Sequence, residues 1–502
     1  MGPVCIFRVD AAPYMGVGHL VRCLALARRL SNKGAQVAFI CRDFAGSAIA
    51  WVEREGFELF RLPTIPAPAN PVDTSGWLAC QAVEDVGQTL GVMERAGIEA
   101  DWLVVDHYGI GAAWETAMKA AFRRVLVIDD LADRAHDCDL LLDQSLRGSN
   151  PYARLVPGSC ITLLGPRYAL LRDEFSRARS ALRARTGSLR RVLVFFGGAD
   201  AAGDTLKAVV ALASLEGQLV ADIIIGPLNI HRLQIERMCA EYPHLQAVVH
   251  ADDMASRLAS ADLAIGGGGV SCWERLAVGL PSLVVEQAAN QAQNIEQLTA
   301  LDVVVPLGRS TEVKVSHFTE ALRNLVEHPT RLKAMTMRAY SIVDAQGTER
   351  VASSILRPAV VLKRATLADL AQVYEWRNSP EVRRFSGQSD AITLEEHRQW
   401  FLETLQRKDR DLLVGEAGGQ PIGVVRFDIV SNRASVSIYV TPMQLGQGWG
   451  SWLLSAAEQW LRRERSEIRG IDAYVMDDNT ASRRMFDSLG YQRIQQNYSK
   501  DL

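Results

Sequence analysis

Short apolar runs alternate with helical patterns along most of this 502-residue chain. A helical pattern covers Leu20–Leu30, and strand-like runs lie at Val4–Val9, Ala35–Cys41, Trp102–Val105 and Val125–Ile128. Continuous apolar runs of this length are typical of parallel strands that are buried on both faces. Because parallel strands need a crossover between them, usually a helix, the pattern predicts a doubly wound α/β domain.

A second series of the same kind follows the first. Its strand-like runs lie at Val192–Phe196, Val220–Ile225, Ala247–His250, Leu263–Ile265 and Ser282–Val285. A basic, helix-prone stretch, Asp173–Arg190, separates the two series, and we interpret it as a hinge. The two series predict two doubly wound domains that face a cleft, residues 1–172 and residues 173–355.

A third domain is expected over residues 358–502. A strand-like run precedes a helical stretch, and paired strands follow it. These strands are expected at Val360–Lys363, Leu412–Glu416, Pro421–Val430 and Ala434–Val440. The expected fold class is therefore a pair of doubly wound α/β domains followed by an α+β domain.

Composition excludes several classes of partner. The formal net charge of −3 gives no electrostatic reason to invoke nucleic acid. No apolar run approaches the roughly 18 residues that a membrane helix needs, and no signal peptide begins the sequence, so we expect a cytoplasmic protein without membrane insertion. The eight cysteines form no CxxC pair, and the nine histidines include no HExxH motif. We therefore expect reduced thiols and no metal site.

One histidine follows a glycine-rich turn after the first predicted strand. The sequence Gly16-Val-Gly18-His19 places His19 at or beside the N-cap of the next helix, where the helix dipole disfavours an imidazolium. A neutral histidine that faces a cleft can accept a proton from water, as a hydrolytic base must. Position alone leaves open the alternative that His19 is hydrogen-bonded into the helix cap.

Polar residues follow the predicted strands at their carboxyl ends. They are Asp10, Asp106, His107, Tyr108, Asp129 and Asp130. Ligands of open α/β sheets bind at this edge, so we expect a polar rim around His19. Any one of these residues can instead cap a helix or stabilise a loop.

Two glycine-rich turns belong to the second series. Gly197-Gly198-Ala-Asp200 follows one predicted strand, and Gly266–Gly269 leads into a helical pattern at Ser271–Val278. Amides at a helix start can hold a diphosphate, and Glu274, one turn into the helix, can bind both hydroxyls of a ribose. Each turn can also be only a tight connection. Asn290-Gln291, which follows, makes the set more specific.

Several of these motifs together resemble the UDP-sugar hydrolases of the pseudaminic acid pathway, relatives of the GT-B glycosyltransferases. The motifs are Arg8-Val-Asp10, Gly16-x-Gly18-His19-x-x-Arg22-Cys23, Gly165-Pro-Arg167-Tyr168-Ala-Leu-Leu-Arg172-x-Glu-Phe175, and Gly266–Glu274 with Asn290-Gln291. The resemblance covers about residues 1–355. It implies a GT-B-like fold and the hydrolysis of UDP-2,4-diacetamido-2,4,6-trideoxy-β-L-altropyranose, in which water attacks the anomeric carbon and UDP leaves.

The same resemblance implies roles for single residues. His19 is the expected catalytic base, and the Gly266–Gly269 region, Glu274 and Asn290 are expected to bind the UDP half. The full set of expected substrate contacts is Asp10, Gly16, Gly18, Arg22, Asp106, Tyr108, Arg167, Tyr168, Gly267, Gly268, Gly269, Ser271, Glu274, Asn290 and Gln291. No metal is expected, because helix dipoles and backbone amides can stabilise the leaving diphosphate.

A glycine-rich loop of another design precedes a helical pattern at Ser451–Leu461. The sequence Leu445-Gly-Gln-Gly448-Trp-Gly450 resembles the R/Q-x-x-G-x-G/A acetyl-CoA loop of GNAT N-acetyltransferases. Leu445 departs from the pattern, with Gln444 one place early, but main-chain contacts tolerate that change. The expected contacts of acetyl-CoA are Leu445, Gly446, Gln447, Gly448, Trp449, Gly450 and Asn479.

Other elements of the third domain match the same family. They are Trp376-Arg377-Asn378, Pro380-Glu381-Val382-Arg383, Asn479-x-x-Ser482 and Leu489-Gly-Tyr491. Phe486 stands where many GNAT enzymes have the tyrosine that reprotonates the CoA thiolate, and a phenyl ring has no proton to donate. Tyr491 or water must replace it, or catalysis depends on positioning alone. An inactive GNAT fold that serves as a scaffold is the alternative.

Together the two resemblances predict a bifunctional enzyme of pseudaminic acid biosynthesis, which supplies a nonulosonic acid for surface glycans or flagellin. It is expected to N-acetylate the 4-amino group of a UDP-amino-sugar with acetyl-CoA and then to hydrolyse the product. Its expected partners are these small molecules and other enzymes of the sugar pathway. The alternatives are a GT-B glycosyltransferase with an accessory acetyltransferase, and a nucleotide-sugar sensor without catalysis. The stereochemistry of the sugar and the oligomeric state stay open.

Overall fold

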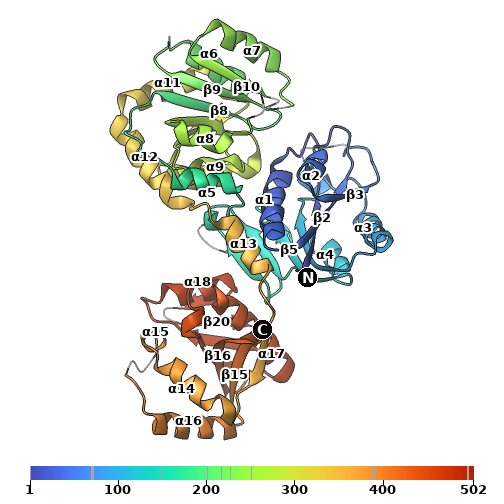
Figure 1. The fold of residues 1–502 in the computed structure, drawn as a ribbon, viewed down its shortest axis with the longest axis vertical. Coiled ribbons are helices and arrows are strands. Elements are labelled where there is room, and N and C mark those ends of the chain that lie inside the picture. Colours follow the sequence, from blue (N-terminus) through green and yellow to red (C-terminus); the bar gives the residue numbers. More distant parts are fainter. Residues whose placement is uncertain are drawn as a thin grey trace. The chain divides into compact units, whose positions relative to one another are not determined.

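A computed structural model gives the fold (Figure 1). It describes residues 2–68, 70, 73–147, 150–200, 202–215, 217–226, 228–249, 251–386, 390–494 and 497–501. The chain divides into two compact units. The first unit comprises residues 1–137, 142–148 and 163–356, and the second comprises residues 138–141, 149–162 and 357–502.

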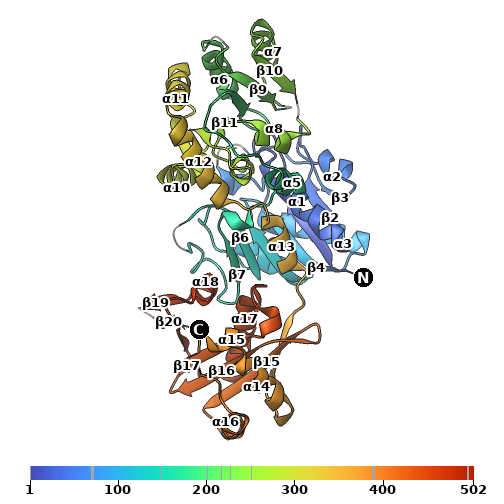
Figure 2. The same cartoon turned by 60° about the vertical axis from the view of Figure 1, so that its left-hand side comes forward.

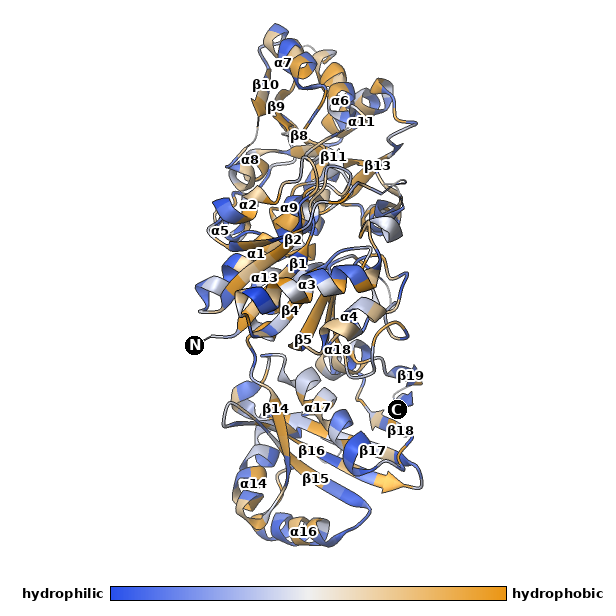
Figure 3. Ribbon diagram, turned by 90° about the vertical axis from the view of Figure 1, so that its right-hand side faces the viewer, coloured by the Kyte–Doolittle hydropathy of each residue, from blue (hydrophilic) through white to orange (hydrophobic). Residues whose placement is uncertain are grey.

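The first sheet has seven strands in the order β3-β2-β1-β4-β5-β6-β7. In chain order the strands are β1 (Val4–Val9), β2 (Gln36–Arg42), β3 (Glu58–Leu62), β4 (Ala100–Asp106), β5 (Phe122–Ile128), β6 (Leu140–Asp143) and β7 (Ile161–Leu164). The helices between them are α1 (Gly18–Asn32), α2 (Ala50–Arg54), α3 (Ala82–Ala96) and α4 (Ala112–Met118). The pairs from β3 to β5 are parallel. Their strands are largely hydrophobic, whereas α3 alternates in hydropathy (Figure 3).

The second sheet has six parallel strands in the order β10-β9-β8-β11-β12-β13. The strands are β8 (Arg191–Phe195), β9 (Val220–Ile225), β10 (Leu245–Val249), β11 (Leu263–Gly267), β12 (Ser282–Glu286) and β13 (Val304–Arg309). The helices are α5 (Asp173–Ser180), α6 (Asp204–Ala213), α7 (Arg232–Glu241), α8 (Met254–Ser260), α9 (Ser271–Ala277), α10 (Ala292–Ala300), α11 (Val315–Glu327), α12 (Pro329–Ile342) and α13 (Gly347–Ile355).

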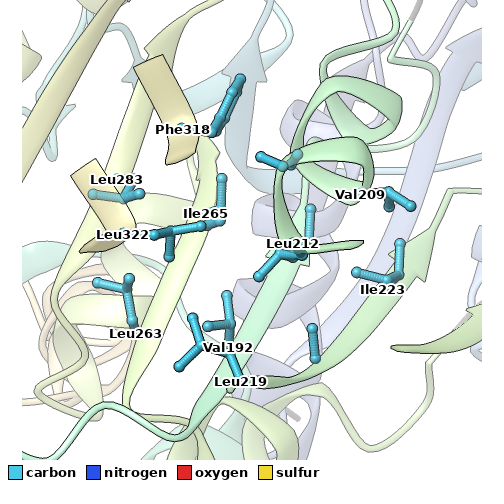
Figure 4. Close-up of a cluster of buried hydrophobic side chains, with 14 of the residues drawn as sticks. Val192, Val209, Leu212, Leu219, Ile223, Leu263, Ile265, Leu283, Phe318 and Leu322 are labelled. Atoms are coloured by element: carbon cyan, nitrogen blue, oxygen red, sulfur yellow. The ribbon is translucent and has the colours of Figure 1, made fainter. Parts of the chain in front are cut away.

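Both faces of the second sheet are covered. On one face, Leu212 of α6 and Phe318 of α11 pack against Ile265 of β11 (Figure 4). On the other face, Ala264 belongs to a separate apolar cluster with Trp273 of α9. Since successive side chains of a strand point to opposite faces, the continuous apolar runs of the sequence fill both clusters.

Each of these two sheets changes its winding direction at one pair of neighbouring strands. The change lies between β1 and β4 in the first sheet and between β8 and β11 in the second. Loops that follow the strands of such a pair diverge and leave a crevice for a ligand at the carboxyl edge. The Gly16–Gly18 turn follows β1, and the turns at Gly197-Gly198 and Gly266–Gly269 follow β8 and β11.

The third sheet has seven strands in the order β14-β15-β16-β17-β18-β20-β19. Its strands are β14 (Val360–Arg364), β15 (Arg410–Ala417), β16 (Gln420–Val430), β17 (Arg433–Val440), β18 (Gly470–Tyr474), β19 (Gln492–Ile494) and β20 (Asn497–Asp501). Its helices are α14 (Leu370–Asn378), α15 (Pro380–Arg383), α16 (Leu394–Gln406), α17 (Trp449–Glu464) and α18 (Thr480–Ser488). Of the six pairs of neighbouring strands in this sheet, β17 with β18 is parallel and the other five are antiparallel.

The predicted fold class is confirmed: two GT-B-like doubly wound sheets precede a GNAT-like mixed sheet. Within the basic stretch Asp173–Arg190, α5 covers Asp173–Ser180, and its role as a hinge stays a prediction. Beyond the end of α5, the Arg185 side chain donates to five carbonyls of residues 258–261 and 278–279, with the shortest bond, 2.6 Å, to Val278 O. His250, the last residue of a predicted strand, lies outside the described residues. The domain limits at 172, 355 and 358 stay predictions.

After the second sheet the chain returns to the first. Helix α13 packs on α1, where Glu349 accepts from Lys33 at 2.6 Å (Figure 2). Thr348, in the first turn of α13, binds the segment that precedes α5: its hydroxyl donates to Leu171 O at 2.7 Å. None of the helices in the described ranges combines the length and the apolar character that crossing a bilayer demands.

Candidate active sites

The glycine turn after β1 positions His19 in the first turn of α1. The helix begins at Gly18 with Val17 as its N-cap, so His19 lies inside the helix rather than at the cap. Gly16 has a φ of +75°, which glycine adopts without strain. A methyl group at Gly18 would lie 3.5 Å from Val270, and one at Gly198 would lie 3.7 Å from Val17. The turns of the first and second sheets therefore meet.

His19 forms a dyad with Asp106, the last residue of β4. Its Nδ1 lies 2.5 Å from Asp106 Oδ1, and both side chains are buried. Burial alone would raise the pKa of Asp106, but the Arg22 guanidinium and His19 outweigh it and hold this pKa well below its usual range. An ionised carboxylate can only accept a hydrogen bond, so the 2.5 Å contact assigns the hydrogen to Nδ1, which then does not accept from Arg22 Nη2, 3.2 Å away. No described residue donates to or accepts from Nε2, whose lone pair is therefore available.

Arg22 supports this dyad from within the protein. Its Nε donates to Asp106 Oδ2 at 2.6 Å, its Nη2 to Asp106 Oδ1 at 2.7 Å and its Nη1 to Asp130 Oδ2 at 3.0 Å. The Arg22 side chain is only 1% exposed. Its predicted contact with substrate stays untested, but the geometry gives Arg22 a structural partner for each of its three nitrogens.

Tyr108 connects the dyad to the second sheet. Its ring meets the His19 ring edge-on at 4.5 Å, and its hydroxyl donates to Asp130 Oδ1 at 2.5 Å. Asn290 Nδ2 lies 3.5 Å from the same hydroxyl. The predicted residues Asp106, Tyr108 and Asn290 are thus brought together with His19, although they come from distant parts of the sequence. Trp77, whose ring centroid is 6.0 Å from that of His19, had no recognisable signal in the sequence.

Asp10 belongs to a different, fully buried network. Its Oδ1 accepts from Arg8 Nη1 and from the Arg42 amide, both at 2.6 Å. His107 Nε2 lies 3.2 Å from Oδ2, and Asp85 of α3 binds both arginines. The Asp10 side chain has no exposed surface, so its predicted role as a substrate contact lacks geometric support. The network instead fixes the end of β1 beside the His19 turn.

The Gly266–Gly269 turn is hydrogen-bonded to the side chain of Gln291. Gln291 Oε1 accepts from the amides of Gly268 and Gln287, both at 3.1 Å. The Gly268 amide, predicted to hold a diphosphate, is therefore already satisfied by Gln291, which was itself predicted to contact substrate. The predicted helix at Ser271 is present, and its first residue is partly exposed.

Glu274, one turn into α9, is nearly buried. Burial raises the pKa of its carboxyl, and Arg172, whose Nη2 lies 3.6 Å away, opposes that shift. Arg167 and Tyr168 stack on each other at 5.2 Å, and Arg350 of α13 donates to Arg167 O at 2.7 Å. Arg167 thus binds α13 through its carbonyl, and Tyr168 lies against the Arg167 side chain.

In the second unit, the loop before α17 has a backbone suited to a glycine motif. Gly446 and Gly448 have φ values of +75° and +77°, and α17 begins at Trp449, two residues before the predicted start. Strands β17 and β18 pair at only three positions, Arg433–Ser435 with Gly470–Asp472. Residues 436–440 therefore continue past this pairing. The glycine-rich loop thus stands at the N-terminus of a 16-residue helix, where backbone amides lack partners within the helix.

Asn479 caps α18, since its Oδ1 accepts from the Ser482 amide at 3.0 Å. Phe486 of α18 is buried between the rings of Tyr491 and Tyr498, at 4.9 and 5.4 Å. Burial and the nearby Glu458 carboxylate raise the pKa of Tyr491 well above its ordinary value. A tyrosine that is only 5% exposed is poorly placed to serve as the expected proton donor, which favours water in that role.

One tyrosine of this sheet, Tyr439, was not among the residues predicted from the sequence. Tyr439 of β17 packs with Trp376 and Trp400 against the apolar cluster of α14 and α16. Burial raises the pKa of its hydroxyl, and Arg377 opposes that shift. The only sequence signal was its position at the end of the strand that precedes the glycine loop.

None of the histidine, cysteine and acidic side chains in the described ranges gathers into a group that suits a metal ion.

Two segments of the chain match known protein families. Residues 192–352 match the glycosyltransferase family 28 C-terminal domain, and residues 359–492 match the acetyltransferase (GNAT) domain. The chain therefore combines a nucleotide-sugar domain of the glycosyltransferase 28 type with an acetyltransferase domain.

Among similar proteins, an uncharacterised protein of Methanocaldococcus jannaschii is 20% identical over 498 residues, 96% of each chain. The UDP-2,4-diacetamido-2,4,6-trideoxy-β-L-altropyranose hydrolase of Campylobacter jejuni is 29% identical over 172 residues, 34% of this chain and 52% of the hydrolase. The spore coat polysaccharide biosynthesis protein SpsG of Bacillus subtilis is 26% identical over 204 residues, 39% of this chain and 58% of SpsG. The chain thus spans just over half the length of the last two relatives.

Proposed function

We propose that the chain is a bifunctional enzyme of the pseudaminic acid type. One site hydrolyses UDP-2,4-diacetamido-2,4,6-trideoxy-β-L-altropyranose, and the other transfers acetyl from acetyl-CoA to the 4-amino group of the precursor UDP-amino-sugar. The observation that carries the hydrolase is the Asp106–His19 dyad with an available Nε2. The similarity to the Campylobacter hydrolase and the glycosyltransferase 28 match support a UDP-sugar as its substrate.

In the proposed hydrolysis, His19 Nε2 takes a proton from a water molecule as its oxygen attacks the anomeric carbon. The bond between that carbon and the diphosphate oxygen breaks, and UDP leaves with the electron pair. Asp106 holds Nδ1–H and stabilises the imidazolium that forms. The turn at Gly269–Ser271 is proposed to hold the departing diphosphate through backbone amides.

In the proposed acetyl transfer, the sugar amine attacks the acetyl carbonyl of acetyl-CoA. A carbon–nitrogen bond forms, the carbon–sulfur bond breaks, the nitrogen gives up one proton to water, and the thiolate of CoA takes one. Phe486 has no proton to supply, and the Tyr491 hydroxyl is buried beside Glu458. Water is therefore proposed to protonate the thiolate, and rate enhancement is assigned to positioning of the two substrates.

The first test uses the intact chain with acetyl-CoA and UDP-4-amino-4,6-dideoxy-N-acetyl-β-L-altrosamine. Free CoA, UDP and the diacetamido sugar are the expected products. His19→Ala should slow UDP release by about 10²–10⁴-fold without changing CoA release. His328→Ala, at an exposed histidine of the same unit, is the matched control and should leave both rates unchanged.

Two outcomes would reject the hydrolase, and a third would reject His19 as its base. Release of UDP only after an acceptor is added would identify a glycosyltransferase. Tight binding of the UDP-sugar without turnover, unaffected by His19→Ala, would identify a sensor. Full UDP release by a folded His19→Ala variant would remove His19 from the reaction.

A further inference from the structure

The first residue of the second unit's main segment, Arg357, contacts the acetyl-CoA loop directly. Its Nη1 donates to Gly448 O at 3.0 Å, and its Nη2 donates to Gln447 O at 2.5 Å. Its guanidinium also lies over the Trp449 ring, with Cζ 4.4 Å from the ring centroid. Three consecutive residues of the loop and helix start are therefore held by one side chain.

These bonds determine where the amides of the loop point. In a trans peptide the carbonyl and the following N–H point in opposite directions. Because Arg357 binds the carbonyls of Gln447 and Gly448, the N–H groups of Gly448 and Trp449 point away from the guanidinium. Those amides stand at the N-terminus of α17, a helix of 16 residues. The opposite face of the loop is where acyl-CoA is expected, so Arg357 turns the donors toward the diphosphate.

Arg357 also supplies a charge that the loop itself lacks. The family motif begins with Arg or Gln, whereas this chain has Leu445, which is 43% exposed. A guanidinium bound to two carbonyls polarises both peptide groups and adds a positive charge behind the loop. Bonds from a charged donor are about twice as strong as neutral ones, so the loop keeps this conformation better with Arg357 than with a neutral side chain.

We propose that Arg357 is a positioning residue for acyl-CoA, which holds the 447–449 peptides so that their amides bind the CoA diphosphate. This proposal rests on the proposed acetyltransferase function. Arg357 follows Leu356, one residue beyond the end of α13. If Arg357 holds the loop for CoA, then bound CoA in turn holds Arg357 in place, because such a coupling acts equally in both directions.

The test compares ligands with and without a diphosphate on the full chain. We expect Arg357→Ala and Arg357→Gln to raise the Kd of CoA, measured by titration calorimetry, by about tenfold. The Kd of pantetheine, which lacks the diphosphate, should change by less than about twofold. Arg357→Lys should restore part of the affinity, since a single ammonium bonds both carbonyls less well than a planar guanidinium. Arg463→Ala is the matched control, because Arg463 is a 71% exposed arginine at the far end of α17.

A second readout follows the linker itself. Hydrogen exchange of the amides of Leu356, Arg357 and Ala359 should slow when CoA binds the wild-type chain and should not respond to CoA in Arg357→Gln. Equal losses for CoA and pantetheine would mean that Arg357 only maintains the fold, and an unchanged CoA Kd would mean that it has no role; either result overturns the proposal. Failure of the wild-type chain to bind CoA would instead reject the acetyltransferase, and this proposal with it.

Discussion

The two glycine-rich loops of this chain use glycine for different physical reasons. At Gly266 and Gly268 the backbone is ordinary, but a methyl group would lie 2.4 Å from Phe195 O and 2.7 Å from Ile295 Cδ1. At Gly446 and Gly448 no heavy atom lies closer than 3.6 Å to such a methyl group, but φ is positive. The first loop needs space and the second needs a left-handed backbone. The two loops are therefore expected to respond differently when their glycines are substituted.

The largest expected effect is on the first loop. Gly266→Ala forces the new methyl group against the backbone oxygen of Phe195, which has little freedom to move within β8. We expect the free energy of unfolding of the first unit to fall by about 1–3 kcal/mol in chemical denaturation. UDP-sugar hydrolysis should fall with the folded fraction. Wild-type stability in this variant would contradict the packing explanation.

The second prediction concerns the pH dependence of the stability of the first unit. Burial would lower the pKa of His136, but Glu115 and Asp129, at 2.7 and 3.9 Å, outweigh it and raise this pKa to about 9. A pKa raised on folding adds stability that is complete below the unfolded value of about 6.5. The first unit should therefore lose stability as the pH rises from about 6.5 to 9.

Thermal unfolding followed across this pH range tests the prediction, with His136→Gln as the comparison. The variant should be less stable than wild type at pH 6 and should lack the decline between pH 6.5 and 9. A decline of the same size in His136→Gln would assign the effect to another group.

The third prediction concerns the left-handed glycines. Gly446→Ala places a Cβ at a φ of +75°, which costs about 1 kcal/mol for an L-residue. Since nothing lies within 4 Å of that methyl group, the cost is confined to the loop. We expect CoA binding to weaken about fivefold, while the unfolding of the second unit changes little. Gly446→Asn should weaken it less, because asparagine tolerates this backbone region.

The smallest expected effect tests the ligand role of the first loop. A methyl group at Gly269 would lie no closer than 3.5 Å to any heavy atom, the nearest being Gln291 Nε2. Gly269→Ala should therefore change the free energy of unfolding by less than about 0.5 kcal/mol. A rise in the KM for the UDP-sugar without a loss of stability would support contact of this turn with the diphosphate. An unchanged KM would mean that the loop serves only packing and does not contact the diphosphate.

Much of the fold was predictable because local patterns report burial. The apolar runs that became β1, β4, β8 and β11 were recognised, since each is buried on both faces. Strands β6 and β7, each of four residues, were not predicted from the sequence. The early start of α17 was missed because glycine and tryptophan are weak indicators of a helix.

The candidate site was predictable in part. His19 was singled out by its glycine turn, and Asp106, Tyr108 and Asn290 were among the candidates that the structure brings near it. Gln291 was expected to contact substrate, yet its amide oxygen closes the turn itself. Arg357 was not among the predicted residues, because its contacts with residues 90 and 91 positions away have no local signature.

The sequence by itself determined the order of helices and strands, the two glycine-rich loops and the histidine at the start of α1. Spacing and burial pattern are local properties, so a sequence shows them directly. Only the tertiary structure decided which carboxylate serves that histidine. Asp10 and Asp106 both follow apolar strands, but Asp106 pairs in register with Val9, one residue before Asp10. Successive side chains point to opposite faces of a sheet, so Asp106 meets His19 while Asp10 turns toward Arg8 and Arg42. Register between distant strands is a long-range property, which no local pattern contains.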